Sequence, residues 1–201
     1  SDGIEADDVI SMVVQNHKYE GWQKIIVSSD KDFFQLCDNE TVLYRPIQKT
    51  FMNKPRILQE FGIHPTNFAL ARAIAGDKSD NLDGVRGVGL KTIAKKMQFF
   101  EEEESVTFDD LFGFCANDNT GLKAFTSILE HRGTIEDNYK IMQLYSPSIS
   151  YQTKAKIQHA LDEFVPQFNK TEIMKRMQED GFGEWNTSDI FATCKRIVSK
   201  A

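Results

Sequence analysis

The chain has 201 residues, of which 40% are hydrophobic and 27% are charged, a balance typical of a soluble globular protein with a sizeable core. Its longest apolar runs are too short to cross a bilayer and its first residues do not resemble a signal peptide, so a membrane protein is excluded and an intracellular one is expected. The net charge of -6 by itself argues against a nucleic-acid partner, but seven carboxylates in three short motifs carry -7, which leaves +1 for the rest.

The first predicted elements are a helix over residues 4–15 and a strand over residues 24–29. The helix has apolar residues at roughly helical spacing and acids in its first turn, where the helix dipole favours them. The strand is a short β-branched run, which suits a parallel strand buried on both faces. Asp30 and Asp32 follow it directly, at the sheet edge where parallel α/β proteins bind ligands.

A second strand is predicted over residues 41–44. It ends at Arg45-Pro46, because proline cannot continue a central strand. Asn53 and Pro55 then predict the N-cap and first turn of a helix that ends at Gly62. Another helix is expected from His64 to Gly76, just before the third acidic motif.

The rest of the chain is predicted to be almost wholly helical, and its cysteines show no pattern of a metal site. The three cysteines lack a Cys-x-x-Cys pair and are expected to be small buried apolar residues: Cys37, Cys115 and Cys194. The helices are expected near residues 107–114, 121–131, 135–144, 151–164, 171–179 and 188–200.

Three acidic motifs carry the strongest chemical signal of the chain. Hard divalent cations prefer oxygen ligands, and a pair of such cations needs carboxylates from several elements that converge. Like charges packed this closely are unfavourable without a counter-ion. The motifs contain Glu5, Asp7 and Asp8, then Asp30 and Asp32, and finally Asp77 and Asp80.

Each motif also has a simpler explanation. An Asp after a strand is often the N-cap of the next helix, acids in a first turn complement the helix dipole, and the third motif could be an ordinary turn. For any single motif the simpler explanation is favoured. The three motifs together, followed by a phosphate-type loop, favour a metal site.

That loop and the helix after it, residues 84–97, contain four basic residues and no acid. The glycines allow a tight turn and a close approach of the backbone, and a helix start offers N–H groups to an anion. Lys91 and Lys95 are four residues apart and would share a helix face. This pattern favours sequence-independent contact with phosphates, although a simple corner between two helices is the alternative.

In this order the motifs resemble those of the 5′-nuclease family, which covers phage 5′-exonucleases, the 5′-nuclease domain of bacterial DNA polymerase I and flap endonucleases. The resemblance is carried by residues 3–9 (GIEADDV), 28–36 (SSDKDFFQL), 44–46 (YRP), 61–65 (FGIHP) and 76–92 (GDKSDNLDGVRGVGLKT). It covers about the first half of the chain strongly and the helical tail more loosely.

The resemblance implies an α/β fold: a partial PIN-like parallel-sheet core in residues 1–50, and a mostly helical region, 51–201, with a helix-three-turn-helix motif at about 70–100. It implies two Mg²⁺ or Mn²⁺ ions, with Asp30 and Asp77 as catalytic residues. The first ion would be held mainly by Glu5, Asp7, Asp8 and Asp30, and the second by Asp32, Asp77 and Asp80, with Asp30 between the two. The DNA contacts implied are Arg86, Gly87, Val88, Gly89, Lys91, Thr92 and Lys95, with K⁺ at the same hairpin.

The implied function is a metal-dependent 5′-3′ exonuclease or flap endonuclease, with RNase H activity, in DNA replication or repair. Its partners would be duplex DNA with a 5′ end or flap, RNA/DNA hybrids and replication proteins, and it would act as a monomer in the cytoplasm of a bacterial or phage-infected cell. Family members begin with further acidic motifs and a helical arch, whereas the resemblance here starts at the third motif. Two alternatives therefore stay open: a non-catalytic duplex-DNA-binding fragment, and a structural α/β protein whose acids are only caps.

Overall fold

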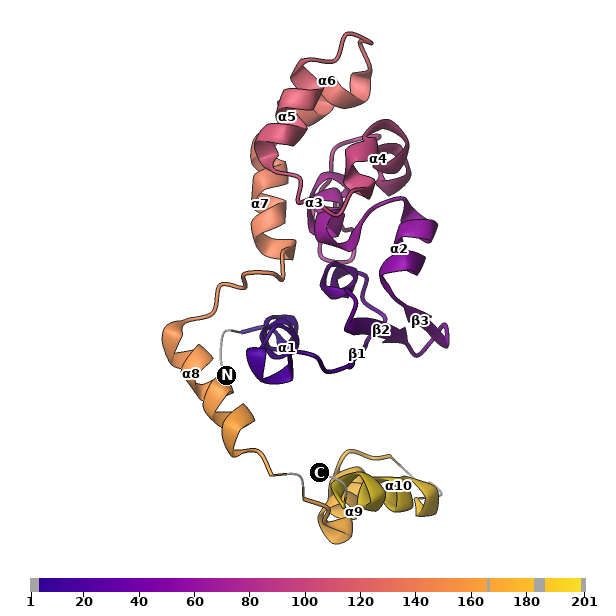
Figure 1. Cartoon of the computed structure of the whole chain (residues 1–201), viewed down its shortest axis with the longest axis vertical. Coiled ribbons are helices and arrows are strands. Elements are labelled where there is room, and N and C mark those ends of the chain that lie inside the picture. Colours follow the sequence, from indigo (N-terminus) through magenta and orange to yellow (C-terminus); the bar gives the residue numbers. More distant parts are fainter. Residues whose placement is uncertain (1–3, 166, 183–186, 200–201) are drawn as a thin grey trace. The chain divides into compact units, whose positions relative to one another are not determined.

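The computed structural model describes residues 4–165, 167–182 and 187–199. The chain divides into two compact units, Ser1–Ile149 and Ser150–Ala201 (Figure 1). Within the first unit one hydrophobic core continues across residue 50, because Leu43 and Met52 of the sheet belong to the same buried cluster as Ile57 and Phe68. The division of the chain at residue 50, into part of an α/β core and a helical region, thus stays a prediction.

A three-stranded sheet lies in the first unit, in the order β1-β2-β3. Strand β1 (Lys24–Val27) pairs in parallel with β2 (Thr41–Arg45), which pairs antiparallel with β3 (Thr50–Met52). The register aligns Ile26, Leu43 and Met52 across the sheet, and all three are at most 5% exposed. This face therefore packs on the core, and the mixed α/β fold class is confirmed.

The expectation that the first strand is buried on both faces is wrong. Ile26 is buried, but its neighbours Ile25 and Val27 are 54% and 65% exposed. Since side chains alternate along a strand, both point to the opposite face of the sheet, where Phe51 of β3 is 52% exposed as well. The short strand β3 was not predicted, because three residues after a turn carry too little periodicity to be recognised.

Three helical elements flank β1 in the sequence, two before it and one after it. Helix α1 (Ala6–Val14) confirms the first predicted helix. Its buried Ser11 donates a hydrogen bond to the carbonyl of Leu144, which lies 133 residues further along the chain. The 3-10 helix η1 (His17–Tyr19) follows α1, and the 3-10 helix η2 (Asp32–Leu36) follows β1. The side chains of Phe33 and Phe34 anchor η2 in the core, at 2% and 0% exposure.

Helices α2 (Lys54–Phe61) and α3 (Pro65–Ala75) begin and end where the sequence predicts. The Asn53 side chain accepts a hydrogen bond from the Arg56 N–H at 3.1 Å, and Gly62 ends α2 with a φ of 64°. Helix α3 is the central element, since most of its residues are buried and it packs against both η2 and α7.

The remaining elements of the first unit are helical, as predicted. The capping box between Thr107 and Asp110 starts α5, and the buried side chain of Asn138 on α7 donates hydrogen bonds to the carbonyls of Ala73 and Asp83 at 3.0 and 2.9 Å. These elements are α4 (Leu90–Lys96), the 3-10 helix η3 (Gln98–Glu101), α5 (Phe108–Ala116), α6 (Lys123–Glu130) and α7 (Arg132–Met142).

The second unit consists, in its described part, of α8 (Tyr151–Glu163), α9 (Lys170–Glu179) and α10 (Ser188–Val198). The rings of Phe168 and Phe191 lie 5.8 Å apart and give this unit an aromatic contact of its own. The predicted end of the last helix at Lys200 lies outside the described residues. Among the helices that the structure describes, none is both long and apolar enough to cross a membrane.

Candidate functional site

The third acidic motif is a tight turn after α3. The backbones of Asp77 and Leu82 exchange two hydrogen bonds, of 2.8 and 2.7 Å, and the Asp77 carboxylate also accepts one from the Ser79 N–H at 2.8 Å. The turn interpretation of this motif is therefore right, but the turn also fixes where Asp77 and Asp80 stand.

Two glycines bring this turn against the end of α3. A Cβ on Gly84 would lie 2.1 Å from the Ala75 carbonyl oxygen, and a Cβ on Gly76 would lie 2.3 Å from the Gly84 nitrogen. Gly76 also has a φ of +76°, which other residues rarely adopt. Only glycine permits this contact between two backbones, which places the acidic turn at the carboxyl end of α3.

Asp32, Asp77 and Asp80 come together at this point. Each offers a carboxylate oxygen, and these three oxygens lie within 4.8 Å of one another. Asp32 is the first residue of η2, at the carboxyl end of β1, and α3 bridges the distance because it packs against η2. The structure thus joins the second and third acidic motifs into one cluster.

Arg72 of α3 lies between two members of this cluster. Its Nε donates to Asp32 Oδ1 at 2.9 Å, and a terminal nitrogen of its guanidinium forms an ion pair with Asp77. The three side chains are only 12–15% exposed, so solvent screens these ion pairs weakly. Arg72 therefore balances part of the negative charge.

The pKa values connect the first motif to the same cluster. Burial raises the pKa of Asp7, and the charges of Asp30, Glu5, Asp8 and Asp80 raise it further, in that order. Residues from all three motifs thus act on one carboxyl group of α1. Asp7 lies near enough to the second and third motifs for their charges to destabilise its anion.

Asp32 responds to two opposing influences. Burial raises its pKa most strongly, while the charge and the hydrogen bond of Arg72 lower it, and the charges of Asp30 and Asp80 raise it again. On balance the pKa of Asp32 is raised above its ordinary value. A site that holds its acids against this repulsion favours a bound cation.

Local capping explains the position of some of these acidic residues but not of all of them. Asp30 Oδ1 accepts a hydrogen bond from the Asp32 N–H at 2.9 Å, so Asp30 does stabilise the local turn. Glu5, in contrast, is the N-cap of α1 and forms no side-chain capping bond. Capping accounts for single residues but not for the meeting of three motifs.

A cavity of about 260 Å³ opens beside the cluster, lined by Ser29, Asp30, Lys31, Arg72, Asp77 and Ser79. Its lining is mostly polar and includes carboxylates and hydroxyls, the oxygen donors that Mg²⁺ and Mn²⁺ prefer. The donor set therefore fits a hard divalent cation. Sequence reasoning named Asp30 and Asp77 of this lining and missed Ser29, Lys31, Arg72 and Ser79. The signal for Arg72 was a lone charged residue in an alanine-rich helix, five residues before Asp77.

The basic segment takes the form of a glycine turn that leads into α4. Gly87 has a φ of +80°, Gly89 is the N-cap, and a Cβ at either position would meet nothing within 4 Å. Of the other predicted DNA contacts, Arg86, Lys91 and Lys95 are exposed and Thr92 is partly buried. Val88 is only 2% exposed and packs in the core, so it offers a partner no more than its backbone.

Residues 1–62 match the family model described as the 5′-3′ exonuclease N-terminal resolvase-like domain. The chain is 33% identical over 104 residues to the 5′-3′ exonuclease of Aquifex aeolicus and 37% identical over 97 residues to the thermostable DNA polymerase I of Thermus aquaticus. Over these residues the chain is similar to 5′-nucleases. The predicted resemblance to this family is thereby confirmed.

Two solved structures are similar to this chain in fold. T5 5′-exonuclease with bound divalent metal ions (zinc) has a TM-score of 0.65 at 17% identity, and the match covers 80% of this chain and 60% of that one. A pseudo-enzyme-product complex of the phage T5 flap endonuclease with DNA and metal ions has a TM-score of 0.67 at 18% identity, with the same coverage.

These matches span only parts of the proteins compared. The Aquifex match covers 52% of this chain and 36% of that exonuclease, and the Thermus match covers 48% of this chain and 11% of that polymerase. The chain thus corresponds to about a third of the Aquifex relative and a smaller share of the polymerase.

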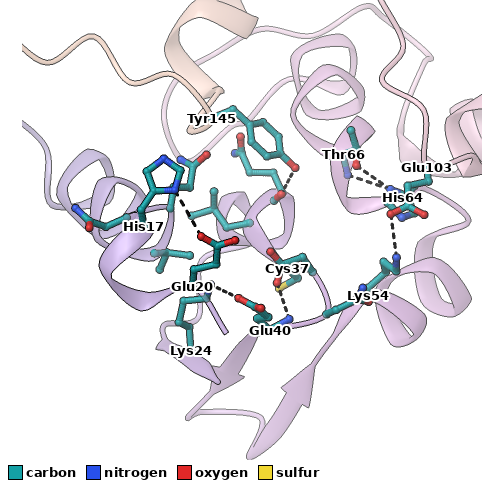
Figure 2. Close-up of a pocket in the computed structure, with 17 residues that line it drawn as sticks. His17, Glu20, Lys24, Cys37, Glu40, Lys54, His64, Thr66, Glu103 and Tyr145 are labelled. Carbon is teal, nitrogen blue, oxygen red and sulfur yellow. Dashed lines mark hydrogen bonds and ion pairs between the residues drawn. The ribbon is translucent and has the colours of Figure 1, made fainter. Parts of the chain in front are cut away.

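A separate cavity of about 400 Å³ lies at the opposite, amino end of the parallel strands (Figure 2). Lys24, the first residue of β1, forms an ion pair with Glu40 at 2.9 Å on its wall, and Lys54 pairs with Glu103 at 3.1 Å. Lys24 and Lys54 are thus each paired with an acid of this wall. The group of carboxylates that could hold a metal ion among the described residues, Asp32, Asp77 and Asp80, lies at the carboxyl end of the parallel strands instead.

Proposed function

We propose that this chain forms part of a divalent-metal-dependent 5′-nuclease that hydrolyses phosphodiester bonds at 5′ ends or flaps of duplex DNA. The observation that carries the proposal is the meeting of the second and third acidic motifs: the Asp32, Asp77 and Asp80 oxygens lie within 4.8 Å of one another. The effect of the same cluster on the pKa of Asp7 supports it. The relatives named 5′-3′ exonuclease favour this reaction over other metal chemistry.

In this proposal the acidic residues hold two Mg²⁺ or Mn²⁺ ions. Glu5, Asp7, Asp8 and Asp30 serve mainly one ion, and Asp32, Asp77 and Asp80 serve the other. Two such cations, when bound, supply the charge that activates a water molecule and stabilises the leaving oxygen.

Arg72 acts on this site through its two acidic neighbours. It fixes the rotamers of Asp32 and Asp77 and offsets their repulsion, so the carboxylates stay clustered before a cation binds. Arg72 is therefore a positioning residue in this proposal, and Asp30 and Asp77 are the catalytic ones.

The basic segment holds the duplex beside the acids. The exposed side chains of Arg86, Lys91 and Lys95 contact phosphates, and the open backbone at Gly87 and Gly89 lets the strand approach closely. Main-chain carbonyls of this turn also hold K⁺ in the proposal. Such contacts carry no sequence information, as a nuclease that acts on DNA ends in replication or repair requires.

The decisive experiment measures cleavage of a DNA duplex with a labelled 5′ flap in Mg²⁺. Asp30→Asn and Asp77→Asn should each abolish cleavage, whereas Asp109→Asn, an exposed control on α5, should leave it unchanged. Undiminished cleavage by both site variants would refute the metal assignment. An RNA/DNA hybrid as a second substrate tests the RNase H activity, and replacing K⁺ by Na⁺ tests the hairpin ion.

A second candidate function is duplex binding without turnover. The ion pairs of Arg72 favour it, because the guanidinium of Arg72 already neutralises part of the charge of Asp32 and Asp77. This alternative predicts salt-dependent binding that survives EDTA, together with no cleavage of any DNA or hybrid substrate. Loss of duplex binding after Lys91→Ala and Lys95→Ala is common to both functions, so turnover is what separates them.

A further inference from the structure

A run of four glutamates, residues 101–104, is held in one conformation by a buried asparagine. Asn67 of α3 is 1% exposed, and its Nδ2 donates to the carbonyls of Glu102 and Glu104 at 2.9 and 3.0 Å. Its Oδ1 accepts from the Val106 N–H at 2.8 Å. A segment whose composition predicts a solvated loop is therefore fixed to the core at three points.

This fixed backbone sends successive glutamates in different directions. Glu102 has a φ of -72° and a ψ of 153°, and the backbone bends at this residue and the two that follow. Glu103 turns toward Lys54, with which it forms an ion pair, as Figure 2 shows. Glu102 and Glu104 instead line a separate cavity of about 360 Å³.

That cavity has an aromatic wall and an acidic rim. Its lining consists of Phe99, Glu102, Glu104, Ser105, Val106, Asp110 and Phe114. The ring of Phe114 is 40% exposed, yet it packs 4.9 Å from Phe99 and 5.4 Å from Phe125, so the wall is already formed. An ordered apolar wall lowers the entropy that a partner must lose on binding.

Three acids surround this wall, and none of them has a basic partner among the ion pairs of the described residues. Hydrogen bonds from the side chain and the backbone N–H of Thr107 lower the pKa of Asp110, which keeps this carboxylate charged. Nucleic acid is repelled by such a rim, whereas a positively charged peptide is attracted.

We propose that this acidic pocket, formed by Phe99, Phe114, Glu102, Glu104 and Asp110, docks a basic segment of a partner protein that inserts one aromatic or large aliphatic side chain. The side chain rests on the phenylalanines, and flanking lysines or arginines pair with the acidic rim. Burial of an anchor in a pocket with charge pairs at its edge is the usual anatomy of a peptide-binding hot spot.

The test uses fluorescein-labelled peptides and fluorescence anisotropy on the full chain. A Lys-Lys-Phe-Lys-Lys peptide should bind at least about tenfold more tightly than the same peptide with Ser in place of Phe, a difference of about 1.4 kcal/mol. The double variant Glu102→Gln/Glu104→Gln should weaken the Phe peptide by a similar factor. The control Glu20→Gln/Glu130→Gln makes the same change in net charge elsewhere and should have less than a twofold effect.

Three outcomes would overturn the proposal. Equal binding of the Phe and Ser peptides would show attraction by net charge alone, and equal weakening by both double variants would show the same. Self-association of the protein that the Glu102→Gln/Glu104→Gln variant abolishes would assign the pocket to a second copy of the chain. Because DNA cleavage is not read out, failure here would leave the nuclease proposal untouched.

Discussion

Replacing Arg72 by methionine should make the stability of the first unit depend on divalent cations. The substitution keeps a long apolar stem and removes the guanidinium that pairs with Asp32 and Asp77. In EDTA the variant retains three close carboxylates without their counter-charge. Their mutual repulsion then acts against folding.

The expected loss can be worked from the geometry. Removing one partner of a buried ion pair costs about 3–5 kcal/mol, and the side chains here keep 12–15% exposure, so we expect the lower end, about 3 kcal/mol. A cation that binds the folded state at a hundredfold excess over its Kd returns about 2.7 kcal/mol. Mg²⁺ should therefore restore most of the lost stability, and it should stabilise the variant more than the wild type.

The assay is urea unfolding followed by circular dichroism, in EDTA and in Mg²⁺, with a separate transition fitted for each unit. Arg56→Met, on the exposed face of α2, is the control and should change stability by less than about 0.5 kcal/mol. Adding Asp77→Asn to the Arg72 variant should recover part of the loss in EDTA. A loss below about 1 kcal/mol in EDTA would contradict the expected contribution of Arg72, because the ion pairs would then behave like exposed ones.

Three further predictions concern two residues of the first unit, Gly84 and His64, and the three cysteines of the chain. Gly84→Ala should lower stability by about 3 kcal/mol or prevent folding, as measured by thermal melting, because its Cβ would meet the Ala75 backbone at 2.1 Å. Burial, followed by the charge of Lys54, lowers the pKa of His64 from 6.5, so the folded state resists its protonation; stability should fall as pH drops below 6.5 toward the lowered value, less so in His64→Asn, which keeps a capping side chain. Cys194 is only partly buried, contrary to the expectation from the sequence, whereas burial raises the pKa of Cys37 to about 12 and of Cys115 to about 11. Ellman's reagent at pH 8 should therefore label only Cys194 rapidly until denaturant is added; rapid labelling of Cys37 and Cys115 in the native protein would contradict their burial.

The sequence by itself determined the features that depend on near neighbours. Asn53, Gly62 and Thr107 mark helix ends correctly, because a cap involves only residues within about one helical turn. The acidic motifs were also visible, since their spacing is short and their charge is unusual. The order of these motifs was enough to indicate the family.

Only the tertiary structure decided how distant residues meet. Arg72 reaches an acid forty residues away because α3 packs against η2, and no local pattern encodes that distance. Likewise, Asn67 holds a glutamate run some thirty-five residues further on, and Val27 faces outward although it ends a run of three apolar residues. Each of these outcomes is a property of packing between elements, whose free energy depends on which faces are brought together and not on the residues of one element alone.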